Sequence, residues 1–366
     1  MYSYLILGGG SLVGRTLVQY LIQNKLAKEV RVVDRMLKET GYFSPSCLEA
    51  LKQVEYIQGN LLNPEFVTKV FSKEEGGWDI VVNCALETKF GQPQEIYEDR
   101  ILKSAINLAQ ESVNKKAKVF LQLSTYQVYS SKQNPSKETD KFKPKSTLAK
   151  FYVEAEEAQS KIEGLNMITL RPAIVYGPGD CQNLTPIFVL ARVYQHLNEP
   201  MPLLWKKDFK LNTIHSLDAA RAIHHTACWY IENNKSGLEY FNLVDEGNTD
   251  SAKIESILKD MFSITIESCN SVILSFIKAN LDQFLDDANE KHLEPWSELL
   301  KEYGIFNSPL IPYMEKENIN QIPSWLDGSR ISEVTQFKCQ VPAISKDLLK
   351  KILEEFREMK LWPGEV

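Results

Sequence analysis

Residues 4–14 read Tyr4-Leu5-Ile6-Leu7-Gly8-Gly9-Gly10-Ser11-Leu12-Val13-Gly14, and this stretch decides the fold. Four apolar residues typical of a buried strand run into three glycines, and a helix-compatible sequence follows. Glycine tolerates positive φ and lets backbone N–H groups come close to a ligand, so the turn can hold a phosphate at the start of the helix. Asp34 ends the next apolar run, 20 residues after Gly14. An acid at that place can accept hydrogen bonds from a ribose, although a tight turn followed by a solvated acid is the alternative interpretation.

The first half of the chain alternates β-branched runs with amphipathic stretches. This alternation predicts βαβ units, and hence an α/β fold: a Rossmann-type, doubly wound parallel sheet with helices on both faces. The predicted strands are Tyr4–Leu7, Val30–Asp34, Val54–Ile57, Ile80–Asn83, Val119–Ser124 and Met167–Arg171, and the predicted helices are Leu12–Lys25, Pro64–Phe71, Glu95–Asn114 and Ser146–Ile162.

The pattern becomes less regular after residue 180. We predict an NAD(P)-binding domain over residues 1–180, to which residues 211–232 return, and a smaller C-terminal mixed α/β lobe over residues 181–366. The lobe would serve substrate binding or interaction. The elements predicted after residue 180 are helices at Thr185–His196, Leu217–Ile231 and Ile344–Lys360, several helices between 251 and 304, and a strand at Glu239–Leu243.

The composition excludes several classes of protein. The 366 residues are 43% hydrophobic and 25% charged, which is typical of a globular domain and excludes disorder. A net charge of −6 disfavours non-specific binding to nucleic acid or an anionic membrane. No apolar run approaches the roughly 20 residues of a membrane span, and the first residues do not form a signal peptide.

The cysteines and histidines give no pattern for a metal site or a disulfide framework. The six cysteines are scattered without a Cys-x-x-Cys pair, so we expect reduced thiols and a cytoplasmic protein. His224 and His225 are neighbours in a predicted helix and would face different directions, so the sequence predicts no metal site.

Further motifs extend the pattern that begins at the glycines. Asn60-Leu61 follows the third predicted strand, Asn83-Cys84-Ala85 the fourth, and Ser124-Thr125-Tyr126-Gln127-Val128-Tyr129 the fifth. Later come Arg171-Pro172-Ala173-Ile174-Val175-Tyr176-Gly177-Pro178-Gly179-Asp180 and His215-Ser216-Leu217-Asp218-Ala219-Ala220.

Together, over about residues 3–245, these motifs resemble the extended short-chain dehydrogenase/reductase superfamily. The likeness is to its NAD-dependent epimerase/dehydratase and 3β-hydroxysteroid dehydrogenase branches. The family's G-x-x-G-x-x-G is here Gly8-x-x-Ser11-x-x-Gly14, with serine in place of the middle glycine.

The resemblance implies a nicotinamide dinucleotide as cofactor. NAD is favoured because Asp34 would repel a 2′-phosphate, while Arg35 beside it keeps NADP as an alternative. The residues implied to bind the cofactor are Gly8, Gly10, Ser11, Leu12, Val13, Gly14, Asp34, Arg35, Asn60, Leu61, Cys84, Ala85, Lys150, Pro172, Ala173 and Ile174.

The resemblance also implies a catalytic trio of Thr125, Ser146 and Lys150, and here the sequence departs from the family. The family uses Tyr-x-x-x-Lys, in which the lysine holds the nicotinamide ribose and lowers the pKa of the tyrosine. Lys150, with Glu154 four residues on, fixes the frame and places Ser146 where the tyrosine belongs. A serine hydroxyl is far less acidic than a phenol and is shorter by a ring. The alternative interpretation of Thr125 is a residue that caps the backbone at a strand end, and that of Lys150 is a solvated helix lysine.

Two function classes therefore stay open. One is a dinucleotide-binding protein with impaired Tyr-dependent catalysis, a pseudoenzyme that serves as a sensor or as a scaffold subunit of a protein assembly. The other is an active NAD(P)-dependent oxidoreductase or epimerase acting on a sugar-nucleotide or hydroxysteroid-like substrate. In that case Tyr126, Tyr129 or a water at Lys150 would replace the missing acid. The sequence does not name the small-molecule substrate.

Overall fold

The computed structural model describes residues 1–74, 76–130, 133–206, 208–269, 271–320 and 322–365. The chain divides into two compact units. Unit 1 consists of Met1–Ala173, Ser216–Val244 and Leu326–Val341, and unit 2 consists of Ile174–His215, Asp245–Trp325 and Pro342–Val366. Among the described residues, no helix combines the length and the apolar character needed to cross a membrane.

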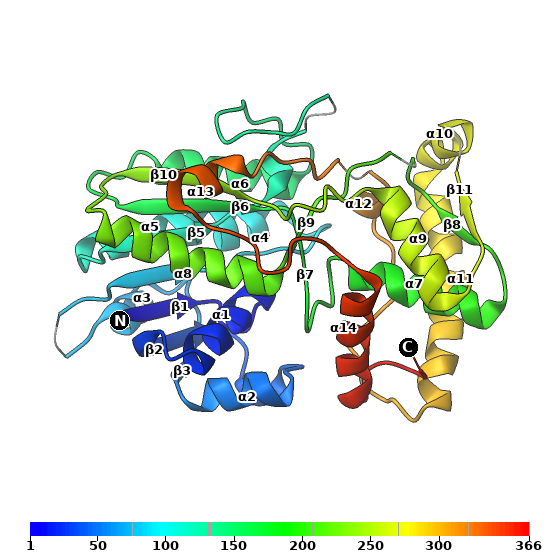
Figure 1. The fold of residues 1–366 in the computed structure, drawn as a ribbon, viewed down its shortest axis with the longest axis horizontal. Coiled ribbons are helices and arrows are strands. Elements are labelled where there is room, and N and C mark those ends of the chain that lie inside the picture. Colours follow the sequence, from blue (N-terminus) through cyan, green and yellow to red (C-terminus); the bar gives the residue numbers. More distant parts are fainter. Residues whose placement is uncertain (75, 131–132, 207, 270, 321, 366) are drawn as a thin grey trace. The chain divides into compact units, whose positions relative to one another are not determined.

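Unit 1 is built on a seven-stranded sheet in which every neighbouring pair is parallel, in the order β10-β6-β5-β4-β1-β2-β3 (Figure 1). The predicted doubly wound α/β fold is therefore confirmed. Its strands are β1 (Tyr2–Leu7), β2 (Ala27–Asp34), β3 (Glu55–Gln58), β4 (Ile80–Asn83), β5 (Val119–Leu123), β6 (Met167–Pro172) and β10 (Leu238–Leu243).

The strand order reverses between β1 and β4. Leu7, at the end of β1, pairs with Val33 of β2 on one side and with Asn83 of β4 on the other. The loops that follow β1 and β4 consequently start side by side at the carboxyl edge of the sheet, which is where doubly wound sheets bind ligands.

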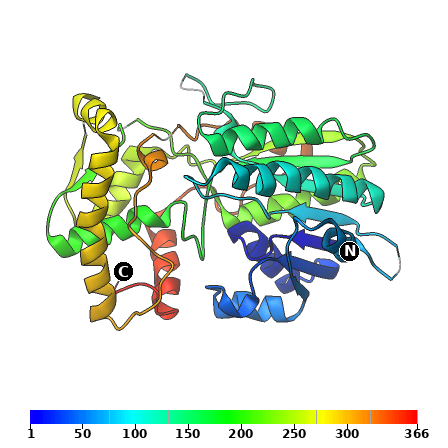
Figure 2. The ribbon, with the colours of Figure 1, turned by 180° about the vertical axis from the view of Figure 1, so that it is seen from behind.

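Helices cover both faces of this sheet (Figures 1 and 2). On one face α1 packs against α2 and α8, and on the other α5 packs against α3 and α6. Completely buried side chains such as Leu5, Val81 and Phe120 form the core under α3 and α5. The helices are α1 (Leu12–Gln23), α2 (Pro45–Lys52), α3 (Pro64–Phe71), α4 (Gln94–Tyr97), α5 (Ser104–Asn114), α6 (Thr147–Gln159), α8 (Ser216–Glu232) and α13 (Ser329–Thr335), with short 3₁₀ turns η1 (Lys38–Thr40) and η3 (Tyr126–Val128).

The helix predicted over Glu95–Asn114 is not uniform. Between α4 and α5 the backbone widens into a π-helical stretch, η2 (Glu98–Lys103). Such stretches occur as bulges within α-helices and are frequently found at functional sites.

Unit 2 is mainly helical. Its helices are α7 (Thr185–Leu197), α9 (Ser251–Phe262), α10 (Ser271–Ala279), α11 (Leu281–Glu302), α12 (Lys316–Ile319) and α14 (Lys346–Glu358), and its two parallel strand pairs join β7 (Ile174–Tyr176) to β9 (Thr213–His215) and β8 (Met201–Leu203) to β11 (Ile266–Ser268). Aromatic side chains hold it together: Trp362 contacts Phe262 and Trp296, and Phe262 stacks on Phe188.

The unit boundaries differ from those predicted at 180 and 211–232. The returning segment extends through Val244 because β10 pairs with β6 along its whole length. A second segment, Leu326–Val341, also belongs to unit 1: the N–H groups of Gln340 and Val341 donate to the buried carboxylate of Asp218.

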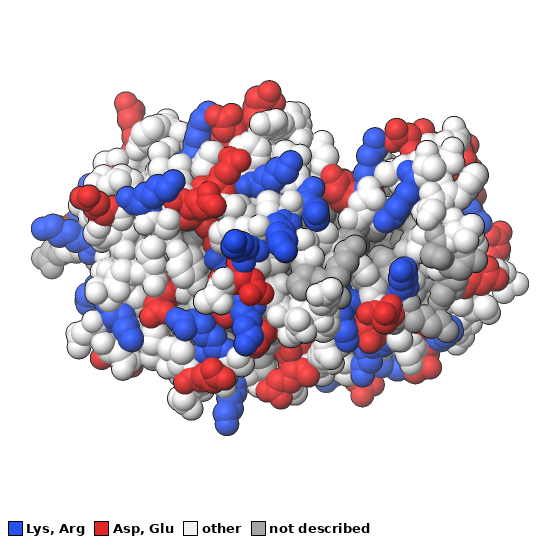
Figure 3. Space-filling model, turned by 90° about the horizontal axis from the view of Figure 1, so that it is seen from above, with Lys and Arg blue, Asp and Glu red and all other residues white. Residues whose placement is uncertain are grey.

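Charged side chains of both signs are interspersed over the face drawn in Figure 3.

Candidate active site

The loop after β1 has no room for side chains at three of its glycines. Gly8 has φ +81°, and a Cβ built on it would lie 2.5 Å from the Ala85 backbone that follows β4. A Cβ on Gly9 would lie 2.1 Å from Val32 Cγ1, and one on Gly14 would lie 2.3 Å from the Gly8 carbonyl oxygen. Glycine is required here because the loop is clamped between the ends of β1, β2 and β4.

Ser11, which replaces the family's middle glycine, is the N-cap of α1. Its hydroxyl accepts from the Gly14 N–H at 3.2 Å and donates to the Gly8 carbonyl at 2.7 Å. The N–H groups of Leu12 and Val13, in the first turn, have no protein acceptor among the described residues. The positive end of α1 therefore keeps donors that an anion can use.

Asp34 ends β2 beside this loop and is buried. One carboxylate oxygen accepts from the Gly10 N–H at 2.8 Å, and the other accepts from the Met36 N–H at 2.9 Å. Arg35 is exposed. The loop after β3 joins the same region, because the Gly59 N–H donates to the Asp34 carbonyl. Beyond it lie the predicted Asn60, which is exposed, and Leu61, which packs against the core.

The end of β4 is a buried polar ladder. The Asn83 side chain accepts from the Ala85 N–H at 3.1 Å and donates to Gln122 of β5 at 3.0 Å. Cys84 lies between Asn83 and Ala85 in the chain. Burial raises the pKa of its thiol to about 12, so the thiol stays protonated at neutral pH. Cys84 therefore lines the switch point as a small apolar residue.

Glu87, in the loop after β4, is tied to the π-helical stretch. Its buried carboxylate accepts from Arg100 Nη1 of η2 at 2.6 Å and from the N–H groups of Thr88 and Lys89 at 3.1 Å. Burial alone would raise the pKa of Glu87. The hydrogen bonds from Lys89, Arg100 and Thr88 and the charge of Arg35 outweigh burial and hold the pKa below its ordinary value. Sequence reasoning missed this contact, since nothing local marks Arg100 as the partner.

The three predicted catalytic residues lie at the end of β5 and on α6. Thr125 begins the turn η3, and its oxygen accepts from the Gln127 N–H at 3.3 Å. Ser146 is the N-cap of α6: its Oγ accepts from the Ala149 N–H at 3.1 Å. Lys150 is exposed on α6, and its ammonium group has no hydrogen-bond or ion-pair partner in the described part of the chain. Their catalytic roles stay predictions.

The two tyrosines considered as replacement acids differ. Tyr129 is buried and bonded to Arg171 Nη1 at 2.5 Å and to Asn242 at 3.3 Å, so its phenol is committed to the core. Tyr126 is half-buried, its hydroxyl forms no hydrogen bond within the described ranges, and burial raises its pKa to about 12. Tyr126 is thus the phenol left free beside Thr125.

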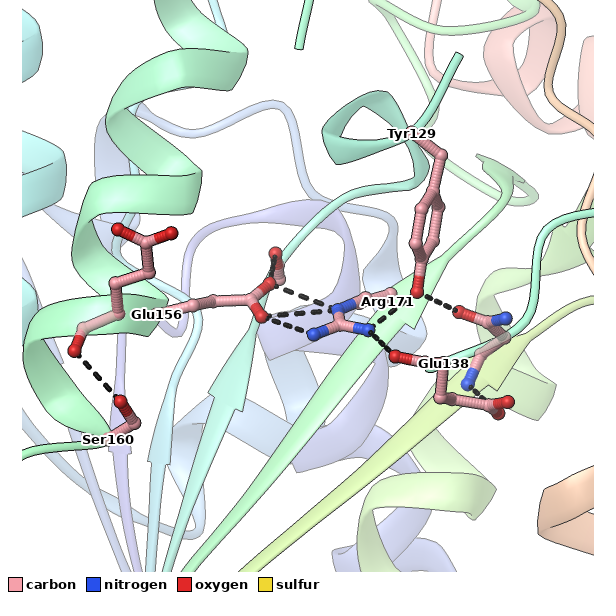
Figure 4. Close-up of polar contacts among 8 residues, drawn as sticks. Tyr129, Glu138, Glu156, Ser160 and Arg171 are labelled. Atoms are coloured by element: carbon pink, nitrogen blue, oxygen red, sulfur yellow. Dashed lines mark hydrogen bonds and ion pairs between the residues drawn. The ribbon is translucent and has the colours of Figure 1, made fainter. Parts of the chain in front are cut away.

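A buried ion pair joins α6 to β6 (Figure 4). Glu156 of α6 accepts from Arg171 Nη2 at 2.6 Å and from the Ser124 hydroxyl at 2.5 Å, and both partners of the ion pair are 3% exposed. Burial alone would lower the pKa of Arg171, but the charge of Glu156 outweighs it and raises the pKa. Glu154, which helped to fix the sequence frame, is exposed instead. An arginine in a buried strand was the available signal that a buried carboxylate must lie nearby.

The remaining predicted cofactor residues lie where the two units divide. Pro172 ends β6, Ala173 is the last residue of the first segment of unit 1, and Ile174 begins unit 2 in β7. Among the described residues no three His, Cys, Asp or Glu side chains are grouped so as to hold a metal ion. His224 bonds the Tyr4 hydroxyl at 2.7 Å, whereas His225 bonds the Thr335 carbonyl.

A family model, described as the NAD dependent epimerase/dehydratase family, matches residues 4–240. The chain belongs to this family.

Several known proteins are similar to this chain. A dTDP-D-glucose 4,6-dehydratase of Dictyostelium discoideum is 28% identical over 131 residues, which span 35% of this chain and 30% of the relative. Two solved structures share the fold. The UDP-glucuronic acid 4-epimerase of Bacillus cereus, a complex with NAD, has a TM-score of 0.69 at 16% identity and covers 98% of this chain and 99% of its own. The dTDP-glucose 4,6-dehydratase DesIV of Streptomyces venezuelae, with NAD bound, has a TM-score of 0.68 at 17% identity and covers 97% of each chain.

Proposed function

We propose that this family member binds a nicotinamide dinucleotide at the loop 8–14, with NAD(H) preferred over NADP(H). The glycine loop carries the proposal, because Gly8, Gly9 and Gly14 let the backbone pack tightly against the strand ends, with the free N–H groups at the start of α1 beside it. A pyrophosphate suits such a helix start, where donors and the helix dipole both favour negative charge. The family name and the NAD complexes of the epimerase and the dehydratase support the same cofactor.

The residues at the end of β2 fit the rest of such a cofactor. A carboxylate offers about four acceptor positions, and Asp34 uses two of them on the N–H groups of Gly10 and Met36. The others can accept the adenosine ribose hydroxyls, whereas a 2′-phosphate would meet a like charge. The exposed Arg35 is the group that could favour the phosphate instead.

The groups toward the reacting end would orient the ligands. A bound nicotinamide supplies a hydride donor or acceptor. Thr125 accepts a backbone hydrogen bond and still has its hydroxyl hydrogen to donate, so it would orient a substrate oxygen. The unpaired ammonium of Lys150 would hold the nicotinamide ribose. The dehydratase and epimerase relatives favour a sugar nucleotide as the substrate class.

Ser146 would not replace the family's tyrosine as proton donor. Its oxygen is an acceptor in the cap of α6, and a serine hydroxyl needs a neighbouring base before it exchanges protons. Loss of a general acid typically lowers the rate about 10²–10⁴-fold. We therefore propose slow or absent Tyr-type catalysis, and a sensor or scaffold role for the dinucleotide-bound protein.

A second candidate is an active epimerase or oxidoreductase in which Tyr126 is the acid. Its hydroxyl is uncommitted and it is the residue next to Thr125, which favours this candidate over one that uses Tyr129. The proton would then come from η3 rather than from α6.

The test combines calorimetric titration with a turnover assay. The wild type should bind NAD(H) at least about tenfold more tightly than NADP(H), which corresponds to about 1.4 kcal/mol. Asp34→Asn should narrow that ratio, whereas Glu39→Gln, which changes an exposed acid on η1, should leave it unchanged. No binding of either dinucleotide would refute the proposal. Turnover of UDP- or dTDP-sugars that Tyr126→Phe abolishes would establish the second candidate.

A further inference from the structure

Unit 2 contains a cavity of about 870 Å³ where its C-terminal segment folds back. The walls come from α7, from the chain just after α11, from the end of α14 and from residues 360–365. The views from the front and from behind agree that the C-terminus lies between α14 and the end of α11 (Figures 1 and 2). The segment itself is fixed: Leu361 and Trp362 are buried, and the Leu361 carbonyl accepts from the Ser308 hydroxyl.

Arg192 of α7 is a half-buried cation in this wall. Its Nε donates to the Pro363 carbonyl at 3.3 Å, and its Nη1 donates to Gln195 Oε1 at 2.6 Å. No carboxylate pairs with it within the described ranges. A guanidinium has five N–H donors, so most of them remain available, and Nη2 lies against Gly364. A half-buried guanidinium with unused donors and no counter-ion among the described residues is suited to bind an anion.

Two more cations complete the lining. Arg357 and Lys360 are exposed at the end of α14 and form no ion pair with a described residue. Their positive charges also suit the negative end of α14. That explanation does not extend to Arg192, which lies more than a turn before the end of α7. Glu365 is the carboxylate of the lining, and it pairs with none of the three cations.

The remaining walls suit an organic ligand. The cavity volume falls within the roughly 300–1,000 Å³ of small-molecule sites, so it exceeds what a single phosphate needs. The ring of Tyr303 is 49% exposed, and its hydroxyl lies beside Gly364, as does Arg192 Nη2. A polar handle and a guanidinium thus meet at one point of the wall, with Arg357 and Lys360 on the adjacent helix end.

We propose that this cavity binds a small molecule that carries two or more phosphate groups. Cations on two different helices call for more than one anionic group, and the guanidinium fork matches phosphate oxygens. The site is built entirely from unit 2, whereas the loop 8–14 belongs to unit 1, so the proposal does not rest on the function proposed above.

The experiment is a calorimetric titration of the full chain with inorganic pyrophosphate at low and high salt. Wild-type binding should weaken with salt, because part of the site is exposed. Arg192→Gln should weaken binding about tenfold or more, and the exposed Arg357→Gln about threefold. Lys350→Gln is the matched control: it removes an exposed cation of α14 that does not line the cavity, and it should leave the affinity unchanged.

Three outcomes would overturn the proposal. The first is the absence of pyrophosphate binding. The second is pyrophosphate binding that is weakened by neither Arg357→Gln nor Arg192→Gln. That result would place the anion elsewhere, for example at the loop 8–14. The third is tighter binding of citrate than of pyrophosphate, which would assign carboxylates in place of phosphates. Arg357→Gln keeps the test decisive if Arg192→Gln unfolds, because Arg357 is exposed and its guanidinium group has no partner among the described residues.

Discussion

Replacing Ser146 by alanine separates a structural role of this residue from a catalytic one. The substitution removes the oxygen that accepts from the Ala149 N–H at 3.1 Å and closes the first turn of α6. Loss of a serine N-cap costs about 0.5–2 kcal/mol, typically about 1 kcal/mol. For a cooperative unit of about 150–250 residues, each kcal/mol lowers the Tm by about 2–4 °C. We therefore expect Ser146→Ala to melt a few degrees below the wild type.

The matched variant is Ser146→Asp. Aspartate keeps an acceptor at the cap and places negative charge at the positive end of the helix, so its Tm should equal or exceed that of the wild type. Scanning calorimetry measures both Tm values. Titration with NAD(H) should give the wild-type affinity for Ser146→Ala, since the cap oxygen does not line the glycine loop.

The reasoning is refuted if Ser146→Ala melts like the wild type yet loses turnover that the wild type possesses. Ser146 would then be a catalytic residue rather than a cap. Ser146→Tyr restores the family's phenol and also removes the cap, so a lower Tm with intact cofactor binding is expected. A gain of turnover in that variant would show that Thr125 and the pocket are still competent.

Three further outcomes are expected. Lys150→Ala should weaken NAD(H) binding by about one to two decades without changing the Tm, and an unchanged Kd in a titration would make Lys150 a solvated lysine. Glu156→Gln should lower the free energy of unfolding, measured by chemical denaturation, by about 3–5 kcal/mol, because it leaves the buried charge of Arg171 unpaired. The control Glu154→Gln, on the exposed face of α6, should change that free energy by less than about 0.5 kcal/mol. Burial lowers the pKa of His292 to about 4, so the unfolded chain binds its proton first as the pH falls. The free energy of unfolding should therefore decline as the pH falls from about 6.5 to 4. His292→Asn should make that decline shallower in denaturation curves measured at several pH values. A steeper decline in the variant would contradict the prediction.

The sequence was sufficient wherever local chemistry sets the structure. Residues 4–14 predict a strand, a turn and a helix because apolar β-formers, glycines and the helix-compatible residues after them each act on their own few residues. The predicted strand Ile80–Asn83 and helix Pro64–Phe71 agree with the structure to the residue, since both are bounded by strong local signals. Asp34 was placed beside the glycine loop by the parallel order of βαβ units alone.

Contacts between distant residues were decided only by the tertiary structure. Three glutamates lie close together on α6, and only the packing of the helix on β5 and β6 selects Glu156 as the partner of Arg171. The same holds for Glu87 with Arg100 and for the return of Leu326–Val341 to unit 1, because each depends on which segments the sheet brings side by side. The sequence shows that position 146 is a serine where the family has a tyrosine. Only the folded chain shows that the serine oxygen accepts a hydrogen bond from the Ala149 N–H. Local propensity acts over a few residues, whereas the burial that pairs a charge or commits a hydroxyl is a property of the assembled core.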